Sequence, residues 1–163
     1  MDIRLRNMTS VYIAKGDKVL LLYRQGSRVV NNVWTGSAGG HFEEYELNDP
    51  KACILREMKE ELGLEQDSVS GLTLRYITFR DTKGEIRQNY YFFAELKDDA
   101  PAQLESNEGV SRWFGIDELA SLEMPFTAKY VVMHYFSEGI KTDKTYVGVT
   151  TDENVFFTEL PKT

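Results

Sequence analysis

The chain has 163 residues, of which 42% are hydrophobic and 28% are charged, a balance that fits one folded domain over residues 1–163 and excludes a disordered chain. The net charge of −7 argues against duplex nucleic acid as a partner, because proteins that bind it carry a basic face toward the phosphates. No apolar run approaches the ~18–20 residues of a membrane span, and a single cysteine excludes an internal disulfide. We therefore expect a cytoplasmic protein without membrane or duplex nucleic-acid partners.

The sequence alternates between apolar runs and turn-forming residues along its whole length. In chain order, this pattern predicts strands at residues 10–13 and 18–23, a glycine-rich polar segment at 26–40, a helix at 50–62, strands at 72–80, 85–96 and 109–116, helices at 117–122 and 125–137, and strands at 146–149 and 154–157. Strands on both sides of one early helix, with another helix late, indicate the α/β class with a mixed sheet between helices.

The helix at residues 50–62 has the clearest boundaries in the sequence. Asp49 is a good N-cap, Pro50 suits the first helical position and Gly63 suits the C-terminal end. Its apolar residues form one stripe, which is expected to pack on the sheet: Ile54, Leu55, Met58 and Leu62. The opposing face is expected to show charged side chains.

Glu57, Glu60 and Glu61 lie three and four residues apart, which puts their carboxylates together on that opposing face. Each like-charged pair costs about 0.2–0.5 kcal/mol, and anions in the last helical turn lose roughly 0.3–1 kcal/mol each to the helix dipole. A divalent cation that prefers oxygen ligands, Mg²⁺ or alternatively Mn²⁺, would offset that cost. A solvated charged face is the other interpretation of the same run.

The residues around this helix carry a longer motif. Five residues separate Gly40 from Glu46, and the stretch at 56–64 reads Arg-Glu-Met-Lys-Glu-Glu-Leu-Gly-Leu. This pattern resembles the signature of the Nudix hydrolases, in which a Gly, five residues, a Glu and seven residues precede Arg-Glu-apolar-x-Glu-Glu-x-Gly-apolar. The stretch at 56–64 agrees with the second part at every specified position.

The motif departs from the family pattern in its loop. Residues 47–55 are nine rather than seven between Glu46 and Arg56, and Ala38 and Tyr45 stand where the family usually has proline and often has glycine. The extra pair is expected in the loop before the helix, so the carboxylate face keeps its geometry.

The resemblance implies a Nudix-type α/β/α sandwich and Mg²⁺-dependent hydrolysis of a nucleoside diphosphate linked to another group. By that resemblance, Glu57, Glu60 and Glu61 bind the metal ions, and the carbonyl of Gly39 adds a further oxygen ligand. Arg56 is expected to hold Glu57 by a charge-assisted hydrogen bond. Either Glu57 or Glu60 would orient or deprotonate the attacking water.

Three further residues have both a functional and a structural interpretation. By the same resemblance, Glu108 is a candidate metal ligand or base, because it precedes the strand that carries Trp113; an exposed loop position is the alternative. Arg24 is a candidate phosphate contact, and a plain surface arginine is the alternative. Glu46 is either a metal ligand or a cap of the loop, and the expected role is support of the loop or of the metal ligands.

By resemblance to MutT-type members, the segment at residues 122–129 would read a purine base. Glu123 is expected to accept hydrogen bonds from the N1–H and the N2 amine of guanine, and a helix-end charge is the alternative. Phe126, Tyr23 or Trp34 would stack on the ring. These expectations favour the 8-oxo-dGTP diphosphatase type, which releases a monophosphate and pyrophosphate from a nucleoside triphosphate.

Other functions stay open at this stage. Within the family, the alternative is an ADP-ribose or nucleotide-sugar pyrophosphatase; outside catalysis, the alternatives are a nucleotide-binding module and a metal-binding structural domain. Non-catalytic modules usually lose glutamates from the signature, whereas this chain keeps all three and Arg56. A small-molecule nucleotide is the expected partner, with a homodimer left open. Cys53 and His134 are interpreted as packing residues.

Overall fold

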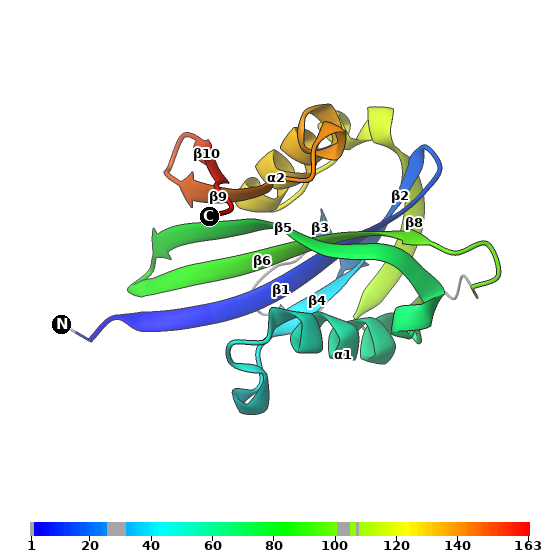
Figure 1. Ribbon diagram of the computed structural model, residues 1–163, viewed down its shortest axis with the longest axis horizontal. Coiled ribbons are helices and arrows are strands. Elements are labelled where there is room, and N and C mark those ends of the chain that lie inside the picture. Colours follow the sequence, from blue (N-terminus) through cyan, green and yellow to red (C-terminus); the bar gives the residue numbers. More distant parts are fainter. Residues whose placement is uncertain (1, 26–31, 101–104, 107) are drawn as a thin grey trace.

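The computed structural model describes residues 2–25, 32–100, 105–106 and 108–163, and its strands form one mixed sheet with helices on both faces (Figure 1). The strands in these ranges are β1 (Arg4–Lys15), β2 (Lys18–Arg24), β3 (Val33–Thr35), β4 (Ala38–His41), β5 (Val69–Thr82), β6 (Glu85–Leu96), β7 (Glu105–Ser106), β8 (Gly109–Gly115), β9 (Thr145–Thr150) and β10 (Val155–Leu160). The α-helices are α1 (Pro50–Leu62) and α2 (Phe126–Ser137), and 3-10 helices lie at Glu44–Glu46, Gln66–Ser68, Ile116–Ser121 and Gly139–Lys141. None of the helices described is long and apolar enough to cross a membrane.

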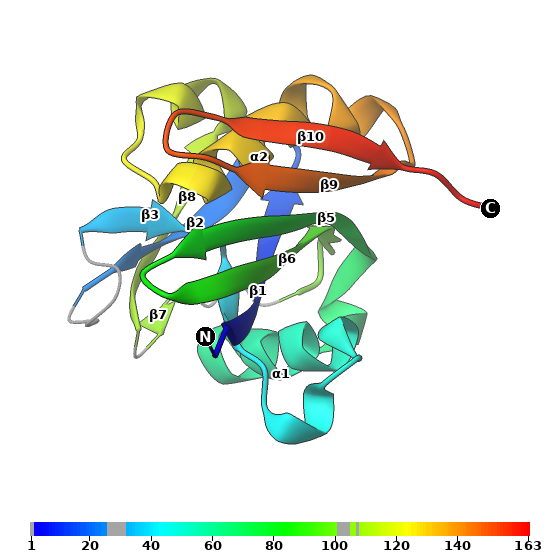
Figure 2. The ribbon, with the colours of Figure 1, turned by 90° about the vertical axis from the view of Figure 1, so that its left-hand side faces the viewer.

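The strands follow the order β10-β9-β5-β6-β1-β2-β8-β7, with β3 attached to β2 and β4 attached to β1. Strand β1 is parallel to β6, and β5 is parallel to β9. Strand β1 pairs with β4 through residues 8–11 and with β2 through residues 13–15, so β2 and β4 diverge from a shared strand. Strands β9 and β10 extend the same sheet beyond β5 (Figure 2). The divergence of β4 brings its glycines against α1.

Two apolar clusters hold the helices to opposite faces of the sheet. Helix α1 contributes Ile54, Met58 and Leu62 to one cluster, where they pack with residues of β1, β2 and β6. Helix α2 contributes Val131 and Val132 to the other, which includes aromatic residues of β1, β5 and β6. Full burial of each such aliphatic side chain is worth roughly 1.5–3 kcal/mol. The predicted α/β sandwich with a mixed sheet is confirmed.

The glycine-rich segment is where the predicted elements differ most from the structure. It contains two strands that the sequence did not predict, β3 and β4, while its residues 26–31 lie outside the described ranges. Strand β1 also begins six residues before the predicted start at residue 10, at Arg4. Strand β4 has only four residues, which are too few to show an alternating pattern. Two of them are glycines, which have no side chain to contribute to such a pattern. The helix predicted at 117–122 is a 3-10 helix, Ile116–Ser121.

Helix α1 begins and ends where its sequence predicts. The side chain of Asp49 accepts a hydrogen bond from the backbone N–H of Ala52 at 3.1 Å. Gly63 ends the helix with a φ of 66°, the left-handed conformation that glycine adopts without steric cost. These caps fix the phase of the helix and therefore the direction of its carboxylates.

The isolated cysteine and the second histidine are both structural. Cys53 is completely buried beside the Thr9 hydroxyl at 3.2 Å, and burial raises the pKa of its thiol to about 12. His134 shares a 2.6 Å hydrogen bond between its Nδ1 and the Tyr76 hydroxyl. Neither residue lines the cavity described below.

A buried arginine ties the β9 end of the sheet to β5. The Arg75 guanidinium donates to the carbonyls of Gly139 at 2.7 Å, Thr142 at 2.9 Å and Lys144 at 3.0 Å.

Arg75→Leu is expected to lower the free energy of unfolding by about 2–4 kcal/mol, because it leaves these acceptors without their charged donor. Urea unfolding measures the loss. The control Arg112→Leu replaces an exposed strand arginine; equal effects of the two substitutions would contradict the assigned role.

Candidate active site

A cavity of about 520 Å³ opens between α1, β4, the exposed end of β1 and β6, and the start of α2. It collects most of the residues that the sequence singles out: Arg24, Gly39, Arg56, Glu57, Glu60, Glu61, Glu108 and Phe126. These residues come from five different elements or loops, so their convergence is a property of the fold.

The three glutamates of α1 line this cavity, but two of them are buried. Glu57 and Glu61 are 8% and 9% exposed, whereas the side chain of Glu60 is 59% exposed. The prediction that all three lie on a face opposite the apolar stripe is therefore wrong for Glu57 and Glu61. The reason is β4, whose glycines leave room for carboxylates beneath the helix: a Cβ on Gly40 would collide with Glu57 Oε1.

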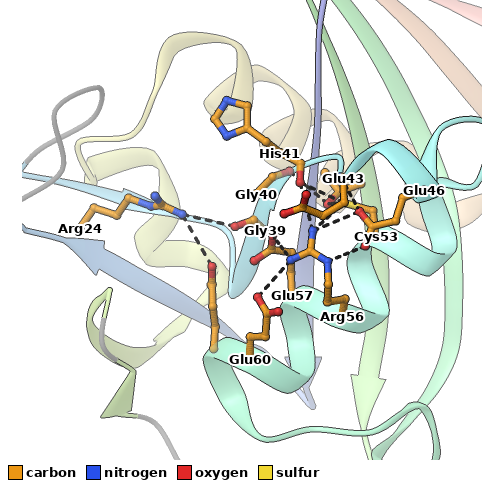
Figure 3. Close-up of polar contacts among 12 residues, drawn as sticks. Arg24, Gly39, Gly40, His41, Glu43, Glu46, Cys53, Arg56, Glu57 and Glu60 are labelled. Carbon is orange, nitrogen blue, oxygen red and sulfur yellow. Dashed lines mark hydrogen bonds and ion pairs between the residues drawn. The ribbon is translucent and has the colours of Figure 1, made fainter.

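Arg56 organises the entrance side of the cavity, and Figure 3 shows its guanidinium among three glutamates. Its Nη1 donates to Glu57 Oε1 at 2.9 Å and to Glu60 Oε2 at 3.0 Å. Its Nη2 donates to the carbonyl of His41 at 3.1 Å. One side chain thus fixes α1 to the loop after β4 and orients Glu57, as the resemblance predicts.

Glu46 is the buried anchor of the same guanidinium. It accepts two parallel bonds, from Arg56 Nε to Oε1 and from Arg56 Nη2 to Oε2 at 3.1 Å, and it is completely buried. The hydrogen bond from Arg56 lowers the pKa of this carboxyl to about 2, against the effect of burial. Glu46 Oε2 also accepts the backbone N–H of Glu43 at 2.9 Å. These contacts fit the expected role of Glu46, which is to support the loop and, through Arg56, the proposed metal ligands.

The depressed pKa of Glu46 gives a pH signature of stability. The folded-state pKa, about 2, lies below the unfolded value of roughly 4.3, so the ionised pair stabilises the fold above that value. This contribution is expected to disappear as pH falls from about 5 toward about 2. Measured by urea unfolding, the stability of the wild type and of Glu46→Gln should converge over that window, since protonated Glu46 resembles glutamine. Parallel curves would contradict the pairing.

Glu61 lies on the other side of the cavity, beside Arg24. Burial raises the pKa of Glu61 to about 8, with Glu57 and Glu108 adding to the rise and Arg24 opposing it. Arg24 lies 3.9 Å from Glu61 Oε1 and 3.6 Å from Glu108 Oε2. Its Nη2 donates to the Gly39 carbonyl at 3.4 Å (Figure 3). Arg24 and Glu108 are therefore both placed at the site.

The donor set fits a divalent cation. Glu61 Oε2 is buried without a hydrogen-bond partner among the described residues, and burial also raises the pKa of Glu57. An unpartnered buried carboxylate is costly unless a charge compensates it. Among the described residues, no three His, Cys, Asp or Glu side chains lie close enough together to form a ready metal site. Arg56 pairs with Glu57 and Glu60, and Arg24 lies beside Glu61 and Glu108. Carboxylate oxygens are nevertheless the ligands that Mg²⁺ prefers.

Of the residues expected to read the base, only one lines the cavity. Phe126 lines the cavity at the start of α2. Glu123 is exposed and is not among the lining residues; its carbonyl accepts the backbone N–H of Trp34 at 2.8 Å. Tyr23 and Trp34 pack against each other with ring centroids 4.9 Å apart, outside the lining. The base-reading roles stay predictions.

Sequence reasoning missed the polar floor of the cavity. Arg6, Arg80, Arg87 and Asn89 lie on β1, β5 and β6 and line the same space. For Arg87 and Asn89 the signal is the alternation within residues 85–91, which places polar side chains on one face of a strand. The relevant neighbours become visible only once the strand pairing is known.

Comparisons with known proteins agree with this geometry. The sequence matches the family model described as NUDIX domain over residues 4–135, a region that ends before β9 and β10. No curated protein has a significantly similar sequence. A mutator MutT protein from Bacillus halodurans is 22% identical with a TM-score of 0.67, over 97% of this chain and 99% of that chain. A NUDIX hydrolase from Nitrosomonas europaea is 18% identical with a TM-score of 0.72, over 92% and 81%. At these identities the two structures support the fold.

Proposed function

We propose, from the premise that this chain belongs to the NUDIX domain family, that it cleaves nucleoside triphosphates to a monophosphate and pyrophosphate with Mg²⁺ as cofactor. Family membership makes it a pyrophosphohydrolase of nucleotide-linked compounds. The observation that carries the proposal of triphosphate cleavage is that Glu57, Glu60 and Glu61 line one cavity together with several arginines. Arg56 holds Glu57 and Glu60, and Arg24 lies beside Glu61. The favoured substrate is 8-oxo-dGTP, and Mn²⁺ is the alternative cofactor.

The buried glutamates are the proposed metal ligands. Glu57 and Glu61, with the Gly39 carbonyl, present hard oxygen atoms to one side of the cavity. The bound cation would neutralise the phosphate oxygens and lower the pKa of the attacking water. Arg24, whose Nη2 donates to the Gly39 carbonyl, is proposed to bind a phosphate oxygen of the substrate. Glu108, close to Arg24, is proposed as an additional ligand.

Glu60 is the carboxylate with room for the nucleophilic water. Its side chain is 59% exposed, whereas Glu57 is held between Arg56 and Gly40. A general base must reach the water within hydrogen-bond distance, and an exposed carboxylate next to the ligands meets that requirement. We therefore assign proton acceptance to Glu60 and metal binding to Glu57.

The net charge of the chain and the chemistry of its site lead to the proposed binding partner and cellular compartment. A small-molecule nucleotide is the partner, reached without duplex nucleic acid or a membrane, and the cytoplasm is the proposed compartment. A homodimer stays a prediction. Base reading by Glu123 and stacking by Phe126 are kept as proposals for the guanine specificity.

A substrate panel tests the proposed function. Purified protein with Mg²⁺ is supplied with 8-oxo-dGTP, dGTP, the other nucleoside triphosphates, ADP-ribose and a nucleotide sugar, and the released phosphates are identified. Preferential release of 8-oxo-dGMP and pyrophosphate is the expected result. Equal rates on every purine nucleotide would remove the guanine assignment, and faster ADP-ribose or nucleotide-sugar cleavage would move the protein to that class. Glu60→Gln should be inactive, while Glu65→Gln, a similarly exposed glutamate paired with Lys59, should stay active.

A further inference from the structure

Three arginines stand in one row across three neighbouring strands of the sheet. Arg6 of β1 is the register partner of Arg87 of β6, and Arg87 is the partner of Arg80 of β5. Side chains directly opposite each other in paired strands point to the same face. All three accordingly line the cavity that holds the α1 glutamates. Figure 2 shows β1, β6 and β5 side by side near the N-terminus.

The row carries more positive charge than the one carboxylate paired with it neutralises. Glu85 is the acidic partner of both Arg6, at 3.2 Å, and Arg87, at 2.8 Å. Arg80 forms no ion pair with any described residue, and its guanidinium lies 5.8 Å from the centroid of the Phe126 ring. Like charges directly opposite in a sheet are destabilising. Three half-buried arginines with one carboxylate therefore form a site that favours an anion.

The row is continuous with the catalytic end of the cavity. Arg6 Nη1 lies 3.3 Å from His41 Nε2, and the carbonyl of His41 accepts Arg56. At the far end, Arg80 meets Phe126 at the start of α2. Because neighbouring strands are about 4.8 Å apart, the row spans roughly 10 Å. An extended anion can therefore lie along it and contact more than one arginine. Guanidinium groups in this arrangement match phosphate oxygens, which they bind in a fork.

We propose that Arg6, Arg87 and Arg80 form a second phosphate subsite, which binds a phosphate group beyond the three of a nucleoside triphosphate. The inference rests on the proposed function for the position of the cleaved bond. It predicts that a nucleotide with a further phosphate group binds more tightly than the corresponding nucleoside triphosphate. That phosphate has two chemical sources: a longer 5′-polyphosphate chain, or a phosphate on the ribose.

The test compares nucleotides that share one parent. Equilibrium affinities for GTP, guanosine 5′-tetraphosphate and guanosine 5′-triphosphate 3′-diphosphate are measured by calorimetry in EDTA, where no hydrolysis is expected. The wild type should bind at least one extended nucleotide about tenfold or more tightly than GTP, since hydrogen bonds to charged groups are the strong ones. The tetraphosphate arm reports the chain source, and the 3′-diphosphate arm reports the ribose source.

Variants separate the subsite from general charge effects. Arg80→Gln and Arg87→Gln should remove the preference for the extended nucleotide, whereas Arg112→Gln, an exposed arginine outside the cavity, should keep it. Glu85→Gln should strengthen the preference, because it releases Arg6 and Arg87 from their carboxylate. Thermal melting checks that each variant is folded.

The outcomes distinguish this inference from the proposed function. Extended nucleotides that bind no more tightly than GTP would overturn the subsite, whatever the protein hydrolyses with Mg²⁺. A preference equally present in Arg80→Gln and Arg87→Gln would overturn it as well. A preference that depends on these arginines, in a protein that cleaves none of the panel compounds, would support the subsite and refute the proposed function.

Discussion

Glu57→Gln and Glu61→Gln are expected to lower Mg²⁺-dependent kcat/KM by roughly 10²–10⁴-fold, since a metal-bound transition state loses several kcal/mol with a ligand. The same substitutions should leave the fold intact. Burial raises the pKa of both carboxyls, so the ionised side chains are costly in the folded protein, and a neutral amide of the same shape removes that cost. Steady-state kinetics and urea unfolding on the same preparations measure both effects.

The control for this pair is Glu65→Gln, which changes an exposed glutamate just beyond α1. It should alter neither activity nor stability, because exposed ion pairs contribute little. A fall in both activity and stability for Glu57→Gln and Glu61→Gln would assign these residues to structure. Full activity in both variants would remove them from the metal site.

Arg56→Gln is expected to cost about 3–5 kcal/mol of the free energy of unfolding, the largest stability effect predicted for this chain. The substitution leaves Glu46 as a buried carboxylate without its bidentate partner, and removing one member of a buried pair has a cost of that size. It also releases Glu57 and Glu60, so activity should fall together with stability. Chemical unfolding and kinetics provide the two measurements.

A double substitution isolates the cause. Glu46→Gln added to Arg56→Gln should recover part of the lost stability, because the second change removes the unpaired charge. Lys59→Gln is the matched control: a neighbouring basic residue of α1 whose pair with Glu65 is exposed. Equal losses for Arg56→Gln and Lys59→Gln would show that the buried pair adds nothing to the stability of the loop.

Local sequence features predicted α1 and its motif well. Asp49, Pro50 and Gly63 act through hydrogen bonds and backbone angles within a few residues, so their effect is legible in the sequence itself. Arg56 and the glutamates follow from the 3.6-residue period, which brings residues three and four apart together. The contact from Arg56 to Glu57 follows from the resemblance, and the structure contains it.

Helix periodicity places Glu57 and Glu61 three residues after Ile54 and Met58, respectively, beside the apolar stripe and not opposite it. The space that receives their carboxylates is a different matter, because the helix alone does not supply it. It depends on β4, a four-residue strand with two glycines that pairs with β1 and leaves space under α1. The arginine row was missed for a related reason. Arg6, Arg80 and Arg87 are far apart in sequence, and only the register of β1, β6 and β5 places them side by side. Long-range pairing of this kind leaves no local signal.

The most direct test of the central claim is the rate of nucleotide cleavage as Mg²⁺ is titrated, for the wild type and for Glu61→Gln at constant nucleotide concentration. The wild type should be inactive in EDTA and should gain activity with saturable dependence on Mg²⁺, while Glu61→Gln should need much more Mg²⁺ for a lower maximum. Cleavage that proceeds unchanged in EDTA, or identical Mg²⁺ dependence in both proteins, would contradict the account.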